Sequence, residues 1–444
     1  MNGQLDRVQA IHHQIKPEQL NAGARLCSTS VIKTRFVTGG IVQNFAKHFL
    51  GTCRPAATPV LAIAMALVAA LIVTDSAQAQ TFAVLYTFTN TADGEQPDAS
   101  LFLDAAGNLY GTTQYGGTKG GFGTVFKVNT KGGEVVLRSF AGTPDAEDPY
   151  AGLTRDKAGN FYGTTLYGGT QGGFGTVFKL HAGKETILHS FAGTPDGEDP
   201  RSVLVRDGAG NLYGTTQYGG TNGGYGTVFK LDANEKLSLL YSFAGTPDGD
   251  DPYAGLLRDK AGNLYGTTQY GGTNGGYGTV FKLSSKGKLT LLHSFAGTPD
   301  GVNPLAGLLM DAAGNLYGTT YYGGTKGGFG TVFKLNTKGK LNLLHSFAGM
   351  PDGQNPYSRL IRDAAGNLYG TTFYGGTAGY GAVFKLDTAG KLTVLHSFND
   401  APDGAHPIGG LVLDKAGNLY GTTSDGGDLS CGFSGCGTVF KVTP

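Results

Sequence analysis

The segment AGNLYGTT, or a close variant of it, occurs seven times in this chain of 444 residues. The asparagines of the seven copies are Asn108, Asn160, Asn211, Asn263, Asn315, Asn367 and Asn418. Successive copies are 51 or 52 residues apart, and the register holds almost to the last residue. A period near 50 is typical of repeat architectures, in which each unit packs mainly on its neighbours. This period constrains the fold more than any local motif does.

Each repeat contains four runs that suit strands. In the unit that starts at Asn263 they read NLYGTT, GTVFKL, KLTLLHSF and AGLLMD. The runs are rich in Leu, Val, Phe, Tyr or Thr and are bounded by Gly, Pro, Asn or Asp, as strands commonly are. No stretch between them has the length and the 3.6-residue apolar period of a helix. The sequence predicts an all-β protein.

The links between these strands alternate between short and long. AGLLRD joins NLYGTT, and GTVFKL joins the last strand of a unit, through turns short enough for hairpins. NLYGTT reaches GTVFKL through a loop of the type QYGGTNGGYG, and consecutive units are joined by AGTPDGDDPY. In an antiparallel meander, the two short turns then share one face and the two long links share the other. Four-stranded sheets arranged radially are the blades of a propeller, so seven repeats predict a seven-bladed β-propeller.

The two ends of the repeat region complement each other. TFAVLYTF at 81–88 matches an outermost strand, whereas the last unit ends after its third strand, GTVFKV. We expect the strand at 81–88 to pair with the strand at 437–442 and to close the ring. An open solenoid is the alternative.

Residues 1–79 contain no repeat unit and are predicted to be a leader. The apolar run VLAIAMALVAALIV at 60–73 follows Lys47 and Arg54 and precedes Ala77-Gln78-Ala79. This pattern is typical of a secretory signal peptide, with cleavage expected after Ala79. The run is shorter than the roughly 20 residues of a membrane span. The predicted product is secreted, periplasmic or extracellular, with an uncleaved N-terminal anchor as the alternative.

Charge and composition restrict the partners. Without residues 1–80 the chain has 27 basic and 30 acidic residues and no basic cluster of the kind that binds nucleic acid. We therefore expect no nucleic-acid partner, no membrane span after cleavage and a monomeric ring. The 76 glycines fall in turns, in loops and inside NLYGTT, where the missing side chain is expected to admit a neighbouring backbone.

The cysteine pair Cys431 and Cys436 lies in the long loop of the last unit, where the other units have none. In an exported protein such a pair is expected to form a disulfide that fixes the loop. Free thiols and a CxxxxC metal half-site are the alternatives, but no second pair or neighbouring histidine completes a metal site.

The pattern AGNLYGTTxYGGxxxxGTVFKL followed by LHSFxGTPDGxxPxxGL resembles the choice-of-anchor tandem repeat family of GloVer-containing proteins, which are exported bacterial proteins. The resemblance covers residues 81–444 and implies a signal peptide followed by a repeat array, with no established activity. Members often carry a C-terminal sorting signal. This chain departs from that pattern by ending at Pro444, directly after a strand, and we therefore expect a secreted or periplasmic rather than a C-terminally anchored product.

Acidic residues cluster in the PDG links between the early units. They are Asp145, Glu147 and Asp148; Asp196, Glu198 and Asp199; Asp248, Asp250 and Asp251. Paired carboxylates suit glycoside hydrolysis or calcium binding. Later units replace the acids with Val302-Asn303, Gln354-Asn355 and Ala405-His406, and Pro-Asp-Gly is itself a turn sequence. The preferred interpretation is turn chemistry, with calcium as the only cofactor considered and no metal site predicted.

One repeat position, in LHSF, is histidine in four units: His189, His293, His345 and His396. It is Arg138, Tyr241 or Tyr86 in the others. These residues fall on the strand predicted to be outermost and are expected to face solvent.

A tyrosine begins the long loop in six units, and Asp425 takes its place in the seventh. The six are Tyr115, Tyr167, Tyr218, Tyr270, Tyr322 and Tyr374. Tyrosine offers a flat apolar face and a hydroxyl, which suits stacking on sugars or docking a protein segment. Packing against the adjacent blade is the alternative.

Two functional hypotheses follow. The first is an exported, non-catalytic binding propeller that holds a glycan or protein on the long-loop face. The second is an exported hydrolase or lyase with its site in the central channel, where residues such as His406 or Arg201 break the repetition; no catalytic residue is assigned. A purely structural role at the cell surface is a third alternative.

Overall fold

The computed structural model describes residues 31–38, 41–48, 80–90, 92–432 and 434–444. The chain divides into two compact units, residues 1–77 and 78–444. In the first unit, β1 (Val31–Thr38) and β2 (Ile41–His48) form an antiparallel pair. The predicted signal peptide, including the apolar run at 60–73, lies outside the described residues.

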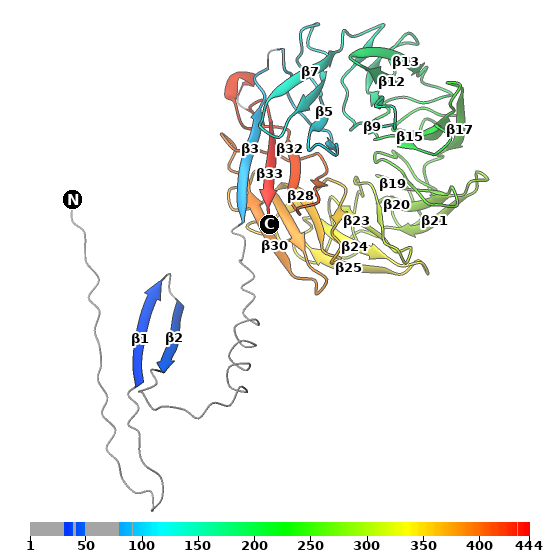
Figure 1. The fold of residues 1–444 in the computed structure, drawn as a ribbon. Coiled ribbons are helices and arrows are strands. Elements are labelled where there is room, and N and C mark those ends of the chain that lie inside the picture. Colours follow the sequence, from blue (N-terminus) through cyan, green and yellow to red (C-terminus); the bar gives the residue numbers. More distant parts are fainter. Residues whose placement is uncertain (1–30, 39–40, 49–79, 91, 433) are drawn as a thin grey trace, which may run out of the picture. The chain divides into compact units, whose positions relative to one another are not determined.

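The second unit is the predicted seven-bladed β-propeller, built from four-stranded antiparallel sheets placed around an axis (Figure 1). The innermost strands are β4 (Phe102–Leu103), β9 (Thr154–Arg155), β14 (Val205–Arg206), β18 (Leu257–Arg258), β22 (Leu309–Met310), β27 (Ile361–Arg362) and β31 (Val412–Leu413). The second strands are β5 (Leu109–Thr113), β10 (Phe161–Thr165), β15 (Leu212–Thr216), β19 (Leu264–Thr268), β23 (Leu316–Thr320), β28 (Leu368–Tyr374) and β32 (Leu419–Thr423).

The third and outermost strands follow the predicted order. The third strands are β6 (Thr124–Val128), β12 (Thr176–His181), β16 (Thr227–Leu231), β20 (Thr279–Leu283), β24 (Thr331–Leu335), β29 (Ala382–Leu386) and β33 (Thr438–Thr443). The outermost strands are β7 (Glu134–Ser139), β13 (Lys184–Ser190), β17 (Leu237–Ser242), β21 (Leu289–Ser294), β25 (Leu341–Ser346), β30 (Leu392–Ser397) and β3 (Thr81–Thr87). Loop residues add β8 (Ala146–Glu147) paired with β11 (Tyr167–Gly168), β26 (Gln354–Pro356) paired with β28, and the 3-10 turn η1 (Leu429–Cys431).

The ring closes between the two ends of the repeat region, as predicted. β3 pairs antiparallel with β33, from Thr81 opposite Thr443 to Thr87 opposite Thr438, and Figure 1 shows the two strands side by side. The Thr422 hydroxyl of the last blade also donates to the carbonyl of Ala99 in the first, at 3.1 Å. The open-solenoid alternative is therefore wrong.

The innermost strands are shorter than the run AGLLMD predicts, because only two of its residues pair with the second strand. In the fifth blade these are Leu309 and Met310. The carbonyl of Ala306, earlier in the same run, instead accepts a hydrogen bond from Thr267 of the preceding blade. The first half of the inner run thus joins neighbouring blades here, and in every blade it contributes residues to the lining of the axis.

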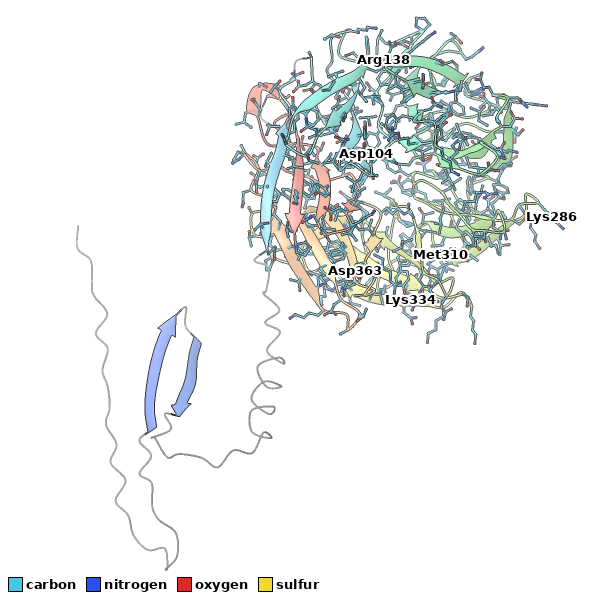
Figure 2. All side chains as sticks on the ribbon, in the orientation of Figure 1. Asp104, Arg138, Lys286, Met310, Lys334 and Asp363 are labelled. Carbon is cyan, nitrogen blue, oxygen red and sulfur yellow. A yellow bond between two sulfur atoms is a disulfide. The ribbon has the colours of Figure 1, made fainter. Side chains whose placement is uncertain are left out.

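The AGNLY signature forms a hydrogen-bonded network at the hairpin turn between the first two strands. In the fourth blade the Asp259 carboxylate accepts the backbone and side-chain N–H groups of Asn263, at 2.8 and 2.7 Å, and the Tyr265 hydroxyl at 3.1 Å. All seven blades repeat this network; Asp104 and Asp363, the equivalents of Asp259, are labelled in Figure 2. The signature is therefore a turn motif.

The core consists of layers between adjacent blades. One layer combines Tyr213, Val228 and Phe243 of the third blade with Leu264 and Phe281 of the fourth. The glycine inside NLYGTT serves this packing: a Cβ on Gly266 would lie 2.6 Å from Cζ of Phe281. The prediction that this glycine admits a neighbouring backbone is therefore wrong, because the glycine instead makes room for an aromatic ring on the paired strand.

Candidate functional site

The six predicted tyrosines lie where the long loop meets the link between blades. Tyr270 exchanges two backbone hydrogen bonds with Asp250, the residue after Pro-Asp-Gly, each at 3.0 Å. Tyr218 does the same with Glu198, and Asp425 takes the equivalent place with Ala405 in the seventh blade. The backbone of each tyrosine is held by two hydrogen bonds, which fixes where its side chain starts.

Five of these tyrosines are exposed, whereas the two glycines that follow each of them are buried. Their exposed fractions run from 38% to 50%, for Tyr167, Tyr218, Tyr270, Tyr322 and Tyr374. Tyr115 is half-buried, and its hydroxyl accepts a hydrogen bond from Gln114 at 2.9 Å. The rings thus contribute both to packing and to the outer surface of the loop-bearing face.

A second aromatic position in the same loops escaped the sequence reasoning. It precedes the third strand and holds Phe122, Phe174, Tyr225, Tyr277, Phe329 and Tyr380. Tyr225, Tyr277 and Tyr380 are 36% to 40% exposed. The ring of Tyr225 lies close to Gly223 and Gly245, where a Cβ would come within 2.8 and 3.2 Å of it. The recurring GGYG and GGFG segments were the available signal.

The first aspartate of each PDG turn binds the outermost strand of its own blade. His189, His293, His345 and His396 place Nε2 2.9 to 3.0 Å from the carboxylate seven residues later. Arg138, Tyr86 and Tyr241 make the equivalent contact in the other blades. The histidine side chains are only 12% to 20% exposed. Their prediction as solvent-facing residues is wrong, because each ring turns toward its turn aspartate.

The remaining acids of the links belong to the first four blades. Burial raises the pKa of Asp98 to about 7 and that of Asp148 to about 6, and it also raises the pKa of Asp199. One oxygen of Asp98 is buried and has no hydrogen-bond partner among the described residues. Within the described residues, no three His, Cys, Asp or Glu side chains come together in a way that could hold a metal ion.

A cavity of about 740 Å³ occupies the axis. Its lining includes the residue after the link proline in each blade, a position that the repeats do not conserve: Asp98, Tyr150, Arg201, Tyr253, Leu305, Tyr357 and Ile408. Two residues further on, the chain has Ser100, Gly152, Val203, Gly255, Gly307, Arg359 and Gly410, which also line it. The residues that line the channel therefore differ from one repeat to the next.

Three tyrosines from different blades meet in this channel. The Tyr357 hydroxyl donates to the Tyr253 hydroxyl and lies 3.4 Å from that of Tyr150. The Arg201 guanidinium carbon lies 5.5 Å from the ring centres of both Tyr150 and Tyr253, and its Nη2 lies 3.7 Å from Asp199. Burial raises the pKa of Tyr150 and of Tyr357, so both hydroxyls remain protonated at neutral pH.

The structure separates the two residues that the enzyme hypothesis named. Arg201 lines the channel. His406 instead stacks on Phe373, with ring centres 4.7 Å apart, and its Nδ1 lies 2.8 Å from Asp425. The channel thus contains one of the two, together with tyrosines that the sequence reasoning did not single out.

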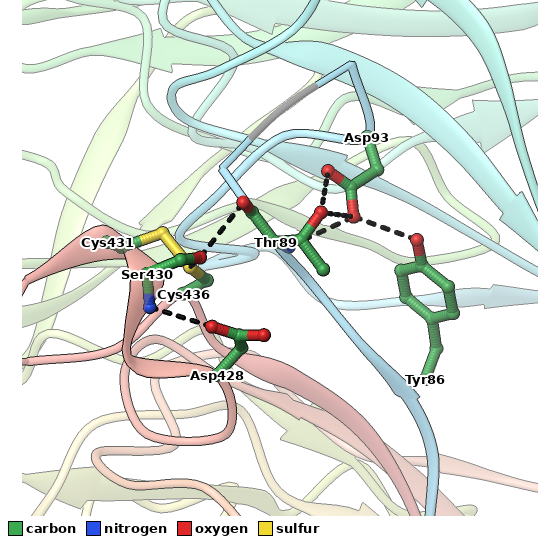
Figure 3. The surroundings of a disulfide bond; sticks show 7 residues. All are labelled: Tyr86, Thr89, Asp93, Asp428, Ser430, Cys431 and Cys436. Carbon is green, nitrogen blue, oxygen red and sulfur yellow. Dashed lines mark hydrogen bonds between the residues drawn. A yellow bond between two sulfur atoms is a disulfide. The ribbon is translucent and has the colours of Figure 1, made fainter.

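The sulfur atoms of Cys431 and Cys436 form a disulfide in the long loop of the last blade (Figure 3). Cys436 is fully buried, and its carbonyl accepts the backbone N–H of Gln96 from the first blade. The Ser430 hydroxyl, next to the disulfide, donates to the carbonyl of Thr89 at 3.0 Å. The bonded loop therefore contacts both sides of the ring closure. Across the described residues, none of the helical structure is long and apolar enough to cross a membrane.

Comparisons with known proteins agree with the repeat architecture. A search of curated proteins gives no match. Among solved structures, the extracellular domain of a candidate one component system from B. thetaiotaomicron is similar over 81% of this chain and 39% of its own, with 12% identity and a TM-score of 0.51. A surface component of the type-IX secretion system of Porphyromonas gingivalis matches over 79% and 46%, with 12% identity and a TM-score of 0.49. This chain spans less than half of either protein.

The likeness to the first of these structures shows the propeller fold alone. The sequence match is more specific, because the model of the Gloeobacter/Verrucomicrobia repeat fits residues 71–223, 171–362 and 329–444. Those ranges include every repeat that forms a blade. The chain belongs to the Gloeobacter/Verrucomicrobia repeat family.

Proposed function

We propose that this protein is an exported binding protein whose long-loop face holds a glycan or protein ligand. The observation that carries the proposal is the set of tyrosines on that face, five of them 38% to 50% exposed. Their backbones are fixed by paired hydrogen bonds, so binding costs little loop ordering. A flat ring with a hydroxyl suits both the apolar face of a sugar and an extended protein segment.

Neighbouring aromatic groups extend the contact surface in some blades. Tyr321 lies 4.6 Å from Tyr322, and Phe373 lies 4.5 Å from Tyr374, centre to centre in edge-to-face arrangements. His406 adds a third ring beside Tyr374, at 5.1 Å. The fifth and sixth blades are therefore where we place the strongest ligand contact.

The binding proposal is tested with the purified protein on a glycan array and in pull-downs from culture fluid. Tyr270→Ala and Tyr322→Ala should weaken the strongest interaction, each by roughly tenfold if the ring is a central contact. Val135→Ala is the matched control, because Val135 is 55% exposed but lies on the outermost strand β7. Unchanged binding in both tyrosine variants would rule out the tyrosine surface.

Export is the second part of the proposal, and the leader pattern supports it. An apolar run at 60–73 before Ala77-Gln78-Ala79 is typical of a cleaved signal peptide. N-terminal sequencing of the protein recovered from the periplasm or medium should begin at Gln80. Recovery of the uncut chain in the membrane fraction would instead support an N-terminal anchor.

A hydrolase or lyase remains the second candidate, because the channel contains groups that occur once. Burial raises the pKa of Asp98 to about 7, which suits a carboxyl that exchanges protons near neutral pH. Incubation with polysaccharides should then release fragments, and Asp98→Asn should abolish the release. Absence of fragments from every polysaccharide that binds would contradict this candidate.

A further inference from the structure

Arg359 is the one long side chain at its level of the channel. The equivalent positions in the other blades are Ser100, Gly152, Val203, Gly255, Gly307 and Gly410. Its side chain runs along Gly307 of the neighbouring blade, where a Cβ would lie 3.6 Å from Cδ of Arg359. Four glycines at this level leave the space that a ligand needs, with a single guanidinium in it.

This guanidinium has no partner within the part of the chain that the structure describes. Arg201, which also lines the channel, has Asp199 beside it, whereas Arg359 forms no hydrogen bond or ion pair with any described residue. Its side chain is exposed to the cavity. The surrounding walls lower the pKa of Arg359 by burial, but an arginine remains a cation at neutral pH. An unpaired cation in a partly enclosed cavity favours an anion.

The acidic residues of the links are concentrated in the first four blades. The links of the first four blades have Glu95, Glu147, Glu198 and Asp250. In the last three blades, the same position holds Val302, Gln354 and Ala405. Arg359 belongs to the sixth blade, one of the three in which this link position is uncharged.

The channel also offers groups for the neutral part of a ligand. Tyr150, Tyr253 and Tyr357 present hydroxyls and ring edges, and Asp98 has a buried oxygen without a hydrogen-bond partner in the described structure. Hydroxyl-rich molecules donate to carboxylates and stack on tyrosine rings. A ligand that combines hydroxyl groups with a carboxylate would match these groups and the Arg359 guanidinium together.

We propose that the central channel binds a sugar acid, with the sugar carboxylate paired to Arg359 and the sugar ring beside Tyr253 and Tyr357. Guanidinium and carboxylate groups form two parallel charge-assisted hydrogen bonds. The site is separate from the exposed tyrosines of the long-loop face, so it stands independently of the function proposed above.

Isothermal titration of the purified protein with galacturonic acid, a sugar with one carboxylate, tests this site, with its uncharged methyl ester as comparison. The acid should bind roughly tenfold tighter than the ester. Arg359→Gln should remove that preference. Arg155→Gln, which changes an exposed arginine outside the cavity lining, should keep it.

Three outcomes would overturn the proposal: no detectable heat with the acid, equal affinity for acid and ester, or an unchanged preference in Arg359→Gln. A thermal melt of each variant shows that the propeller is intact, and the acid should raise the melting temperature of wild type but not of Arg359→Gln. Tyr322→Ala should leave the preference unchanged, which separates failure of this site from failure of the tyrosine surface.

Discussion

Nε2 of His293 lies 2.9 Å from Oδ2 of Asp300, seven residues later. The histidine lies next to the last residue of the outermost strand β21, and the aspartate belongs to the turn that leads to the next blade. The same carboxylate accepts the backbone N–H of Ala296 at 3.0 Å. This pair joins the outer edge of a blade to the link that carries the chain to the axis, and every blade has its equivalent.

Asp300→Ala should lower the free energy of unfolding by about 1–2 kcal/mol, because two hydrogen bonds to the carboxylate are lost. Asp300→Asn retains one acceptor oxygen and should cost less. Urea unfolding measures both. Lys286→Ala is the control, since Lys286 projects from the rim of the ring (Figure 2) and should change stability by less than about 0.5 kcal/mol. Equal stability of wild type and Asp300→Ala would refute a structural role for the pair.

Gly266→Ala should destabilise the fourth blade by about 2–3 kcal/mol. The added methyl group would lie 2.6 Å from Cζ of Phe281, whose side chain is fully buried. Gly208→Ala is the matched control, because nothing lies within 4 Å of the new methyl group there. In a double-mutant cycle, Phe281→Leu should cost less in the Gly266→Ala background than in wild type. Strict additivity would contradict the steric explanation.

Replacing both Cys431 and Cys436 with alanine should weaken the closing blade by up to about 2 kcal/mol, since the disulfide closes only a short loop. Thermal unfolding of the double variant should match that of wild type in reductant. A double variant as stable as oxidised wild type would mean that the loop is held by its hydrogen bonds to Thr89 and Gln96 alone.

Stability should fall with rising pH because of Glu134. Burial, and secondarily the charge of Asp93, raise the pKa of this carboxyl from 4.5 to about 7 in the folded protein. The stability associated with the protonated Glu134 carboxyl is fully present below the pKa of the unfolded state and is lost as the pH rises through the pKa of the folded state. Glu134→Gln should therefore stabilise the protein at about pH 8, by roughly 1–2 kcal/mol after solvent screening, and have little effect near pH 4.

Urea unfolding at several pH values measures this difference, with the exposed Glu235→Gln as control. A stabilisation by Glu134→Gln that is the same at both ends of the pH range would exclude ionisation as its cause.

The number of blades follows from the repeat period, and the ring closure follows from the extra strand at the start and the missing strand at the end. Both features can be read directly from the sequence, so both could be predicted. The His293–Asp300 contact was missed although both residues recur. Tyrosine, arginine and histidine alternate at the first position, and only their shared ability to donate a hydrogen bond reveals the pair. A spacing of seven across a turn matches neither the helical nor the strand period.

The channel was harder to predict, because its residues come together from distant blades. Tyr150 and Tyr357 are 207 residues apart in sequence but 3.4 Å apart at their hydroxyls. Alignment of the repeats shows that the position after the link proline varies, which marks it as unusual. Which of its occupants meet depends on the order of blades around the axis, and Arg359 becomes notable only when its glycine neighbours are seen.

The most direct test of the central claim, that the long-loop face binds the ligand, is amide hydrogen exchange with and without the ligand found on the array. We expect slower exchange in the long loops around Tyr270 and Tyr322, and no change at the hairpin turns near Asn263 and Asn315 on the opposite face. Protection confined to those hairpin turns would contradict it.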